Sequence, residues 1–371
     1  MHILFVDANC PKPYDERTLA HEGLGGTEAT LVRVAHELGT RHEVSVAQRG
    51  RGGCYVSPDG VRYTDFDTER PVRGEPQRVV LINSHKLLKR VHNHYPNAKR
   101  YLWMHCFPGN NKKHLSRWAT RYGYTLLGVS KTHRDVLKTF LKNYQNNPQV
   151  ETPPRLPSIG YVYNPIDEDI ERLRLNTYDW NKLVYFSSPH KGLEQILEHF
   201  KVLRTRCPEL ELHIANPGYI ALNEKGLPAG VRVLGSMPQR EVLRHVRGAL
   251  CVFNPQSSFA ETFGLVFAEA NALGTPVLAH DIGAAREILG DSEQLVDACN
   301  SDAVVAKVLS WRDGARPQVS ANPRFKVSAV AKAWETVFAI PRAAIPKANR
   351  ADVQRRPLRP NQPSSSRPLT P

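Results

Sequence analysis

Residues 253–270 read F-N-P-Q-S-S-F-A-E-T-F-G-L-V-F-A-E-A and continue as N-A-L-G-T-P-V-L-A-H over residues 271–280. The first part has the pattern of a buried strand, a polar loop and the start of a helix. The second part has the pattern of a helix end, a glycine stop and another buried strand. Repeated strand–helix units of this kind indicate a parallel α/β sheet. Two carboxylates, Glu261 and Glu269, interrupt the otherwise apolar helical region.

The same alternation extends along most of the chain. Helical patterns occupy most of the gaps between short apolar runs, for example at residues 27–39, and a last helical pattern covers residues 324–338. A chain of 371 residues is also too long for one ordinary hydrophobic core. We therefore predict an α/β protein with two doubly wound, Rossmann-like parallel-sheet domains and a cleft between them. The expected strands are residues 2–7, 43–48, 78–83, 99–104, 125–130, 182–187, 211–215, 231–235, 249–254 and 276–280.

Composition shifts suggest where the domains begin and end. A polar, proline-rich patch at residues 146–157 precedes the point at which the strand–helix rhythm restarts. The last 31 residues carry seven prolines and seven basic residues with no apolar periodicity, which is typical of disorder. The predicted parts are an N-terminal domain (1–176), a second domain (177–322), a C-terminal helix that can cross back to the first domain (323–340), and a disordered tail (341–371).

The two carboxylates can be placed relative to the predicted crevice. Ligands of open α/β sheets bind beyond the carboxyl ends of the strands, so Glu261 should project into the crevice. Free N–H groups at the helix start, around residues 262–265, form an anion site. Glu269 follows about two turns later, roughly 12 Å along the helix. Hydroxyl, phosphate and diol contacts in this order describe a nucleotide sugar; the alternative is an amphipathic helix with one acid on its solvated side.

This block resembles the E-x7-E block of retaining glycosyltransferases of the GT-B fold, and within them it is most similar to the large family 4. The resemblance extends over about residues 1–340. Further landmarks follow in the family's order: G-L-G-G-T-E (23–28), W-M-H (103–105), G-V-S-K-T-H-R-D-V-L (128–137), Y-N-P-I-D (163–167) and S-S-P-H-K-G-L-E-Q-I-L (187–197).

The resemblance implies a role for each matching position. Glu261 should contact hydroxyls of the donor sugar, Lys191 should neutralise the leaving diphosphate, and His105 should reach the donor from the opposite wall; these are the implied catalytic residues. The other implied positions bind the donor, with Glu269 on the ribose and backbone groups near the phosphates. These donor-binding positions are Gly25, Gly26, Thr262, Phe263, Gly264, Leu265 and Glu269.

The chain departs from the family pattern at the phosphate site. The family commonly has an arginine a few residues before the lysine, whereas V-Y-F-S-S-P-H before Lys191 has none. Arg240, His190 or a base of the first domain could replace it. The resemblance implies retention of anomeric configuration with a nucleotide diphosphate sugar as donor substrate, and neither a cofactor nor a metal is expected. D-F-D (65–67) and D-E-D (167–169) match a metal pattern that is common in polar chains.

The charge of the chain is concentrated in the first domain. The formal net charge is +14, and the segment from Lys86 to Lys142 holds 13 basic residues against one acid, Asp135. An anionic membrane surface is one expected partner, because K-K-H-L-S-R-W-A-T-R-Y (112–122) interleaves bases with Leu115, Trp118 and Tyr122 as an interfacial helix would. Lipid-linked or envelope glycans would then be the acceptors.

Two alternatives remain open at this stage. The same bases could bind DNA phosphates, as in a glycosyltransferase that acts on modified phage-type bases. The absent arginine also permits a non-catalytic protein that binds a nucleotide sugar or a polyanion. UDP-hexoses and GDP-mannose are both plausible donors.

The remaining composition points to the cytoplasm. The N-terminus lacks a basic region before its apolar run, so we expect no signal peptide. The six cysteines are scattered without a C-x-x-C pair, which favours reduced thiols. We expect a cytoplasmic protein that can associate peripherally with the inner face of a membrane.

Overall fold

Two parallel sheets organise the chain. The computed structural model describes residues 1–67, 74–145, 155–173, 178–215, 224, 226–235 and 237–339. Both sheets belong to one compact unit, residues 1–340, and residues 341–371 form a second unit. The predicted disordered tail and the predicted boundary between residues 176 and 177 lie outside the described residues.

The first sheet has the strand order β3-β4-β2-β1-β5-β6-β7-β8, and only the β3–β4 pair is antiparallel. The central strand β1 is buried along its whole length, because helices cover both faces of the sheet. The predicted strands of this half are found within about two residues, whereas the β3–β4 edge was not predicted. The strands are β1 (His2–Asp7), β2 (Glu43–Gln48), β3 (Tyr55–Val56), β4 (Arg62–Asp65), β5 (Arg78–Ile82), β6 (Lys99–Trp103), β7 (Tyr124–Gly128) and β8 (Ile159–Tyr161).

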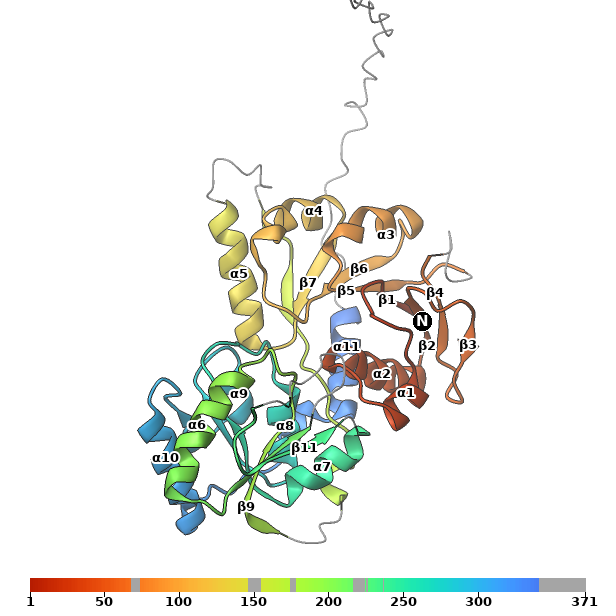
Figure 1. Cartoon of the computed structure of the whole chain (residues 1–371). Coiled ribbons are helices and arrows are strands. Elements are labelled where there is room, and N and C mark those ends of the chain that lie inside the picture. The colour runs from red at the N-terminus through yellow and green to blue at the C-terminus, as the bar shows by residue number, and fades with distance from the viewer. Residues whose placement is uncertain are drawn as a thin grey trace, which may run out of the picture. The chain divides into compact units, whose positions relative to one another are not determined.

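Alternate residues of β1 face two different helical layers. Ile3 and Phe5 pack with α2 (Gly26–Gly39), and Leu4 and Val6 pack with the layer formed by α3 (Leu88–His94), α4 (Leu115–Arg121) and α5 (Lys131–Gln145). This second layer covers the upper face of the first sheet in Figure 1. A short helix, α1 (Glu16–His21), precedes α2 and was not predicted from the sequence.

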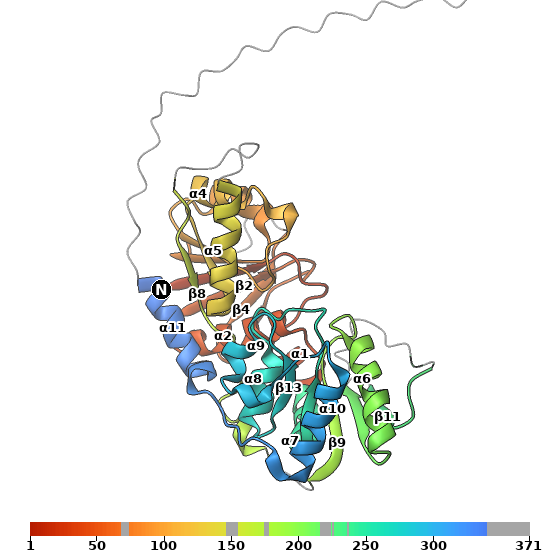
Figure 2. The same cartoon turned by 90° about the vertical axis from the view of Figure 1, so that its left-hand side faces the viewer.

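The second sheet is parallel throughout, in the order β11-β10-β9-β12-β13-β14. Helices α6 and α10 pack together on one face, as Figure 2 shows, and the side chains of α7, α8 and α9 join the core on the other. Its strands are β9 (Asp179–Tyr185), β10 (Glu211–Ala215), β11 (Val231–Gly235), β12 (Ala249–Asn254), β13 (Val277–His280) and β14 (Leu295–Val296). Its helices are α6 (Leu193–Arg206), α7 (Gln239–Arg247), α8 (Leu265–Ala272), α9 (Ala285–Leu289) and α10 (Ser301–Ser310).

The last described helix, α11 (Val327–Ala339), packs against the first sheet although it follows the second in the chain (Figure 1). Trp334 is fully buried, and its ring centroid lies 4.8 Å from that of Trp103 and 6.0 Å from that of Phe5. The Arg78 guanidinium donates to the carbonyl of Phe338 at 2.8 Å. These contacts fix α11 on the β1–β6 region and so tie the two sheets together.

We expect Trp334→Ala to lower the free energy of unfolding by about 3–5 kcal/mol, because it removes a fully buried aromatic side chain and leaves a cavity. Denaturant unfolding followed by circular dichroism measures this change. The matched control is Trp180→Ala, since Trp180 is 49% exposed; a change within about 0.5 kcal/mol is expected there. Equal losses in the two variants would contradict the packing role assigned to α11.

Helix α4 does not present its apolar side outward, as an interfacial helix would. Leu115 is 1% exposed, and the half-buried Trp118 and Tyr122 pack against the same core between this helical layer and the first sheet. Their rings stack on each other with centroids 5.9 Å apart. The interleaved apolar residues are therefore core residues, and the prediction of an interfacial helix at residues 112–122 is wrong in this respect. No helix among the described residues has both the length and the apolar character that a membrane span requires.

Candidate functional site

A cavity of about 1030 Å³ lies at the carboxyl ends of strands from both sheets. The loop after β1, the start of α2 and His105, two residues after β6, form one wall, and the loops after β9 and β12 form the other. Its position agrees with the crevice expected from the sequence. Of the predicted site residues, those that line it are Gly25, Gly26, His105, Lys191, Glu261, Gly264, Leu265 and Glu269.

Lys191 and Glu261 meet inside this cavity. Lys191 follows β9 and Glu261 follows β12, and the two strands are neighbours in the sheet. Lys191 Nζ lies 2.8 Å from Glu261 Oε1, with the two side chains 25% and 14% exposed. The ammonium also lies 4.9 Å from the centre of the Phe259 ring. The pair places one cation and one carboxylate near the N-terminus of α8, where a ligand can reach both.

Two helices begin at the cavity. Gly264 caps α8 in the left-handed region, with φ 87°, and no side chain caps this end. Among the described residues, the N–H groups of Gly264, Leu265 and Val266 have no hydrogen-bond partner. The start of α2 lies against it, since a Cβ on Gly26 would come within 3.1 Å of Leu265 Cδ1. Unpaired N–H groups and the dipole of α8 make this a place for an anion such as phosphate.

Thr262 and Phe263 lie outside the cavity that neighbouring residues of the 253–270 block line. The Thr262 hydroxyl donates to the carbonyl of His105 at 2.9 Å, and its own carbonyl accepts from the Ser130 hydroxyl at 2.6 Å. Phe263 is 1% exposed and packs on Phe325, with ring centroids 5.1 Å apart. Neither residue lines the cavity. They join the second sheet's loop to the first sheet, and the backbone nearest a phosphate is that of Gly264 and Leu265.

His105 is a half-buried residue with an uncharged ring. It lies two residues after the end of β6, its backbone N–H donates to Asn83 Oδ1 at 2.7 Å, and its ring centroid is 4.4 Å from that of Trp103. Burial lowers the pKa of His105 to about 3, and His133 lowers it further. Its Nε2 is buried with no hydrogen-bond partner among the described residues. His105 can therefore offer a hydrogen bond to a ligand at neutral pH but no positive charge.

Glu269 is the most buried acid of the site, with its side chain 3% exposed. Its Oε1 accepts a hydrogen bond from Gln239 Nε2 and lies 3.5 Å from Arg33 Nη2. Burial raises the pKa of Glu269 to about 7, Arg33 opposes this rise, and Asp167 adds to it. Sequence reasoning missed Arg33 and Gln239, because nothing near Glu269 in the chain points to either.

The cations of the cavity differ from those expected in place of the absent arginine. Arg240 and His190 are exposed, and neither lines the cavity. Lys12, from the loop after β1, does line it and pairs with Glu22. Glu28, in the first turn of α2, also lines it, and burial raises the pKa of its carboxyl. Lys12 is thus a first-domain cation that lines the cavity, and proximity in the sequence gave no signal for it.

In both D-x-D matches, aspartate carboxylates form hydrogen bonds or ion pairs with other groups of the protein. Asp65 Oδ2 accepts from the Gly52 N–H at 3.0 Å, and Asp167 pairs with Arg33 through a 2.6 Å contact. Asp169 lies 3.0 Å from Arg172. Neither match gathers three metal ligands among the described residues.

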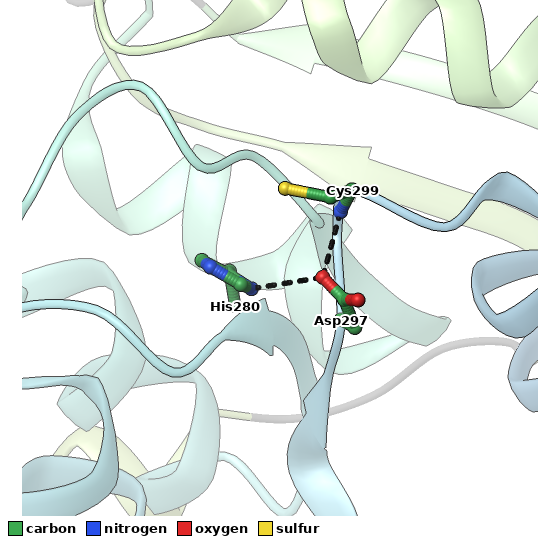
Figure 3. Close-up of side chains that lie close together, drawn as sticks. All are labelled: His280, Asp297 and Cys299. Atoms are coloured by element: carbon green, nitrogen blue, oxygen red, sulfur yellow. Dashed lines mark hydrogen bonds and ion pairs between the residues drawn. The ribbon is translucent and has the colours of Figure 1, made fainter.

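One other group of potential metal ligands lies at the ends of β13 and β14 (Figure 3). His280, Asp297 and Cys299 bring one ligand atom each within 4.8 Å of one another. The ring nitrogen His280 Nδ1 already lies 3.2 Å from both the Val296 carbonyl and the Ala298 N–H. Asp297 Oδ1 accepts from the Cys299 N–H at 2.9 Å. These backbone contacts give the group a structural role at the corner between the two strands.

Some of the basic residues of the first half form an exposed face over one helical layer, which we call the basic face, whereas Arg100 and Lys112 of the same half are buried. Helices α3, α4 and α5 lie next to one another above the first sheet (Figure 1). Five exposed lysines there form no ion pair with any described acid: Lys86, Lys89, Lys113, Lys138 and Lys142. A surface of one charge sign attracts anionic partners over roughly one Debye length, about 8–10 Å.

Part of the chain is similar in sequence to known proteins. Residues 183–321, which contain Lys191 and the 253–270 block, match the family model described as glycosyl transferases group 1. A phosphatidyl-myo-inositol mannosyltransferase of Mycolicibacterium smegmatis is 31% identical over 129 residues, 33% of this chain and 33% of the relative. The same enzyme of Propionibacterium freudenreichii is 32% identical over 111 residues, 30% of this chain and 28% of the relative. The matches thus span about a third of the length of these curated relatives.

Solved structures resemble a larger part of the chain. Sucrose-phosphate synthase from Thermosynechococcus elongatus superposes with a TM-score of 0.62 at 12% identity, covering 91% of this chain and 98% of that one. HepE of Anabaena, solved with UDP and glucose, superposes with a TM-score of 0.55 at 16% identity, covering 92% of this chain and 100% of that one. At these identities the likeness shows the fold alone.

Proposed function

We propose that the protein transfers a hexose from a nucleotide diphosphate sugar to an acceptor with retention of the anomeric configuration. Residues 183–321 match the glycosyl transferases group 1 family model, and the chain has the predicted GT-B fold. The observation that carries the proposal is the Lys191–Glu261 pair beside the open start of α8. Glu261 would bind sugar hydroxyls, Glu269 the ribose, and the N–H groups of Gly264 and Leu265 the diphosphate.

The reaction follows from these roles. The bond between the sugar C1 and the diphosphate oxygen breaks, and the acceptor hydroxyl bonds to C1 on the same face. The hydroxyl proton passes to the departing phosphate oxygen, so the protein needs no carboxylate nucleophile of the kind retaining glycosidases use. Lys191 and the helix start would stabilise the charge that develops on the leaving diphosphate. Lys12 supports the same role from the opposite wall, and we propose that the transfer requires no metal.

The neutral ring of His105 fits a contact with the donor sugar better than one with its phosphate. Its Nε2 is buried without a described partner on the cavity wall opposite Glu261. A neutral imidazole nitrogen can donate a hydrogen bond to a sugar hydroxyl or accept one from it, and it does not compete with Lys191 for the diphosphate.

For the donor and acceptor we propose a UDP- or GDP-hexose and a lipid-linked or envelope glycan at an anionic membrane surface. The relatives are named as mannosyltransferases that act on phosphatidyl-myo-inositol, and HepE was solved with UDP and glucose. The basic face on α3, α4 and α5 would hold the protein peripherally on anionic lipid, with a cost in affinity as salt rises. A cytoplasmic location at the inner membrane face agrees with this proposal.

Transfer of label tests this proposal. The protein is incubated with radiolabelled GDP-mannose or UDP-glucose and either vesicles that contain phosphatidylinositol or duplex DNA with hydroxymethylated bases. We expect label in the lipid fraction, because the relatives and the basic face both favour an anionic lipid surface. Label in DNA would support the DNA-modifying alternative. Absence of label from both, with no binding of either donor, would favour a non-catalytic polyanion-binding protein and contradict the proposal.

A further inference from the structure

A buried arginine connects the first sheet's helix to the carboxylate at the back of the cavity. Arg33 lies on α2, and its side chain is 4% exposed. Its Nε donates to Asp167 Oδ1 at 2.6 Å, and its Nη2 donates to Gln239 Oε1 at 2.9 Å. The same Nη2 lies 3.5 Å from Glu269 Oε1. One side chain of the first half thus holds three groups that come from the loop after β8, from α7 and from α8.

The two oxygens of Glu269 have different surroundings. Oε1 is engaged by Arg33 and Gln239, whereas Oε2 has no hydrogen bond to any described residue. Glu269 nevertheless lines the cavity, although its side chain is 97% buried. The protein therefore contacts this carboxylate through Oε1, and Oε2 is available to a ligand.

We propose that Arg33 is a positioning residue for the donor: its pairing with Oε1 favours the charged form of Glu269 and turns Oε2 toward the ribose hydroxyls of the nucleotide. A residue of the first half would then set the affinity of a site that lies in the second half. This inference rests on the proposed function, in which Glu269 binds ribose. A charged carboxylate accepts hydrogen bonds from two hydroxyls more strongly than a neutral carboxylic acid does.

The electrostatic surroundings of Glu269 support this role. The charged or polar groups that face it are Arg33 on α2, Asp167 in the loop after β8 and Gln239 on α7. Burial raises its pKa to about 7, and Arg33 is the largest influence in the opposite direction. Without Arg33, burial and Asp167 would raise the pKa of Glu269, and only the hydrogen bond from Gln239 would lower it. Glu269 would then be protonated at neutral pH, and its hydrogen bonds to ribose would weaken.

The test measures ribose recognition directly. Calorimetry gives the dissociation constants of UDP and GDP and of their 2′,3′-dideoxy analogues, and the ratio of each pair isolates the ribose contacts from titration of the phosphates. In the wild type the preference for ribose should rise as pH increases through about 7, because Glu269 loses its proton there. In Arg33→Met we expect this preference to fall about tenfold at neutral pH and to recover at about pH 9.

Matched variants separate positioning from a general loss of structure. Arg41→Met changes an arginine two residues after the end of α2 that pairs with Glu335 at the surface, and it should leave the preference unchanged. In Glu269→Gln, adding Arg33→Met should have no further effect on the preference. This double variant leaves no unpaired charge at Glu269, and its melting temperature reports whether the fold is intact.

Three results would overturn the inference. If folded Arg33→Met keeps the wild-type preference for ribose, this inference is overturned while the proposed function stands. The same holds if adding Arg33→Met to Glu269→Gln lowers the preference for ribose further. Failure of the wild type to bind either UDP or GDP would overturn the proposed function and, with it, this inference. The ratio of nucleotide to dideoxynucleotide affinity therefore distinguishes the failure of one from the failure of both.

Discussion

Lys191→Ala is expected to lower the rate of sugar transfer by about 10²–10³-fold while the protein stays folded. Loss of one preorganised group that stabilises transition-state charge has an effect of this size in other enzymes. Lys191 Nζ lies 2.8 Å from Glu261 and beside the unpaired N–H groups at the start of α8. It is the cation best placed to meet a leaving diphosphate. Initial rates of nucleoside diphosphate release measure the loss.

The fold should survive this change, because the Lys191 side chain is 25% exposed. Partly exposed ion pairs contribute about 0–1 kcal/mol to stability. Lys201→Ala is the matched control, since Lys201 lies in the same half and pairs with Glu198 at the surface of α6. Full activity is expected in Lys201→Ala. Transfer by Lys191→Ala at the wild-type rate would show that the leaving group is stabilised elsewhere, with Lys12 the next candidate.

Glu261→Gln is expected to lower kcat/KM by about 10²-fold, because hydrogen bonds from sugar hydroxyls to a charged carboxylate become bonds to a neutral amide. The substitution keeps the shape of the side chain. It also frees Lys191 from its carboxylate partner, so binding of free nucleoside diphosphate should weaken little or become tighter. Steady-state kinetics with the preferred donor, together with calorimetry of the diphosphate product, measure the two effects separately.

The control for this change is Glu198→Gln, in the exposed pair with Lys201, where no kinetic change is expected. Parallel losses of transfer and of nucleoside diphosphate binding in Glu261→Gln would contradict a role on the sugar. They would place Glu261 instead in the framework of the phosphate site. The two measurements thus assign the carboxylate to one end of the donor or to the other.

Much of the second half could be predicted from its sequence because the signals are local. Short apolar runs predicted the strands except β14, with β9 beginning three residues earlier than expected, and the glycine before residues 265–272 marked the start of α8. The cavity position followed from the rule that ligands bind at the carboxyl ends of parallel strands. Glu261 and Lys191 then met because their strands, β12 and β9, are neighbours.

Arg33 could not be found in this way. Leu31, Val34 and Leu38 mark one apolar face of the predicted helix, and Arg33 falls about 200° around the helix from Leu31. Helical periodicity therefore assigns it to solvent. In the structure α2 is buried on more than the face that meets its sheet, because α7, α8 and the loop after β8 also pack there, and Arg33 is 6% exposed. Contacts between residues 134 and 206 positions apart decide this environment, and no local pattern encodes them.

Helix α4 illustrates the opposite error. The mixture of bases with Leu115, Trp118 and Tyr122 was interpreted as an outward amphipathic face. An amphipathic pattern shows that a helix has two different sides, but not whether its apolar side meets a lipid surface or a sheet. Because the first sheet needs cover on this face, α4 turns these residues inward and leaves the charged residues outside. The basic face retains its charge without apolar anchors from α4.

In the proposed function the cavity holds a nucleotide diphosphate sugar, and Lys191 stabilises its leaving group. The most direct measurement is release of nucleoside diphosphate from UDP-, GDP-, ADP- and TDP-hexoses by the wild type and by Lys191→Ala, each with and without EDTA. We expect the wild type to release product from one preferred donor, unaffected by EDTA, and Lys191→Ala to release it about 10²–10³-fold more slowly. Equal release by both proteins, or release by neither from any donor, would contradict this proposal.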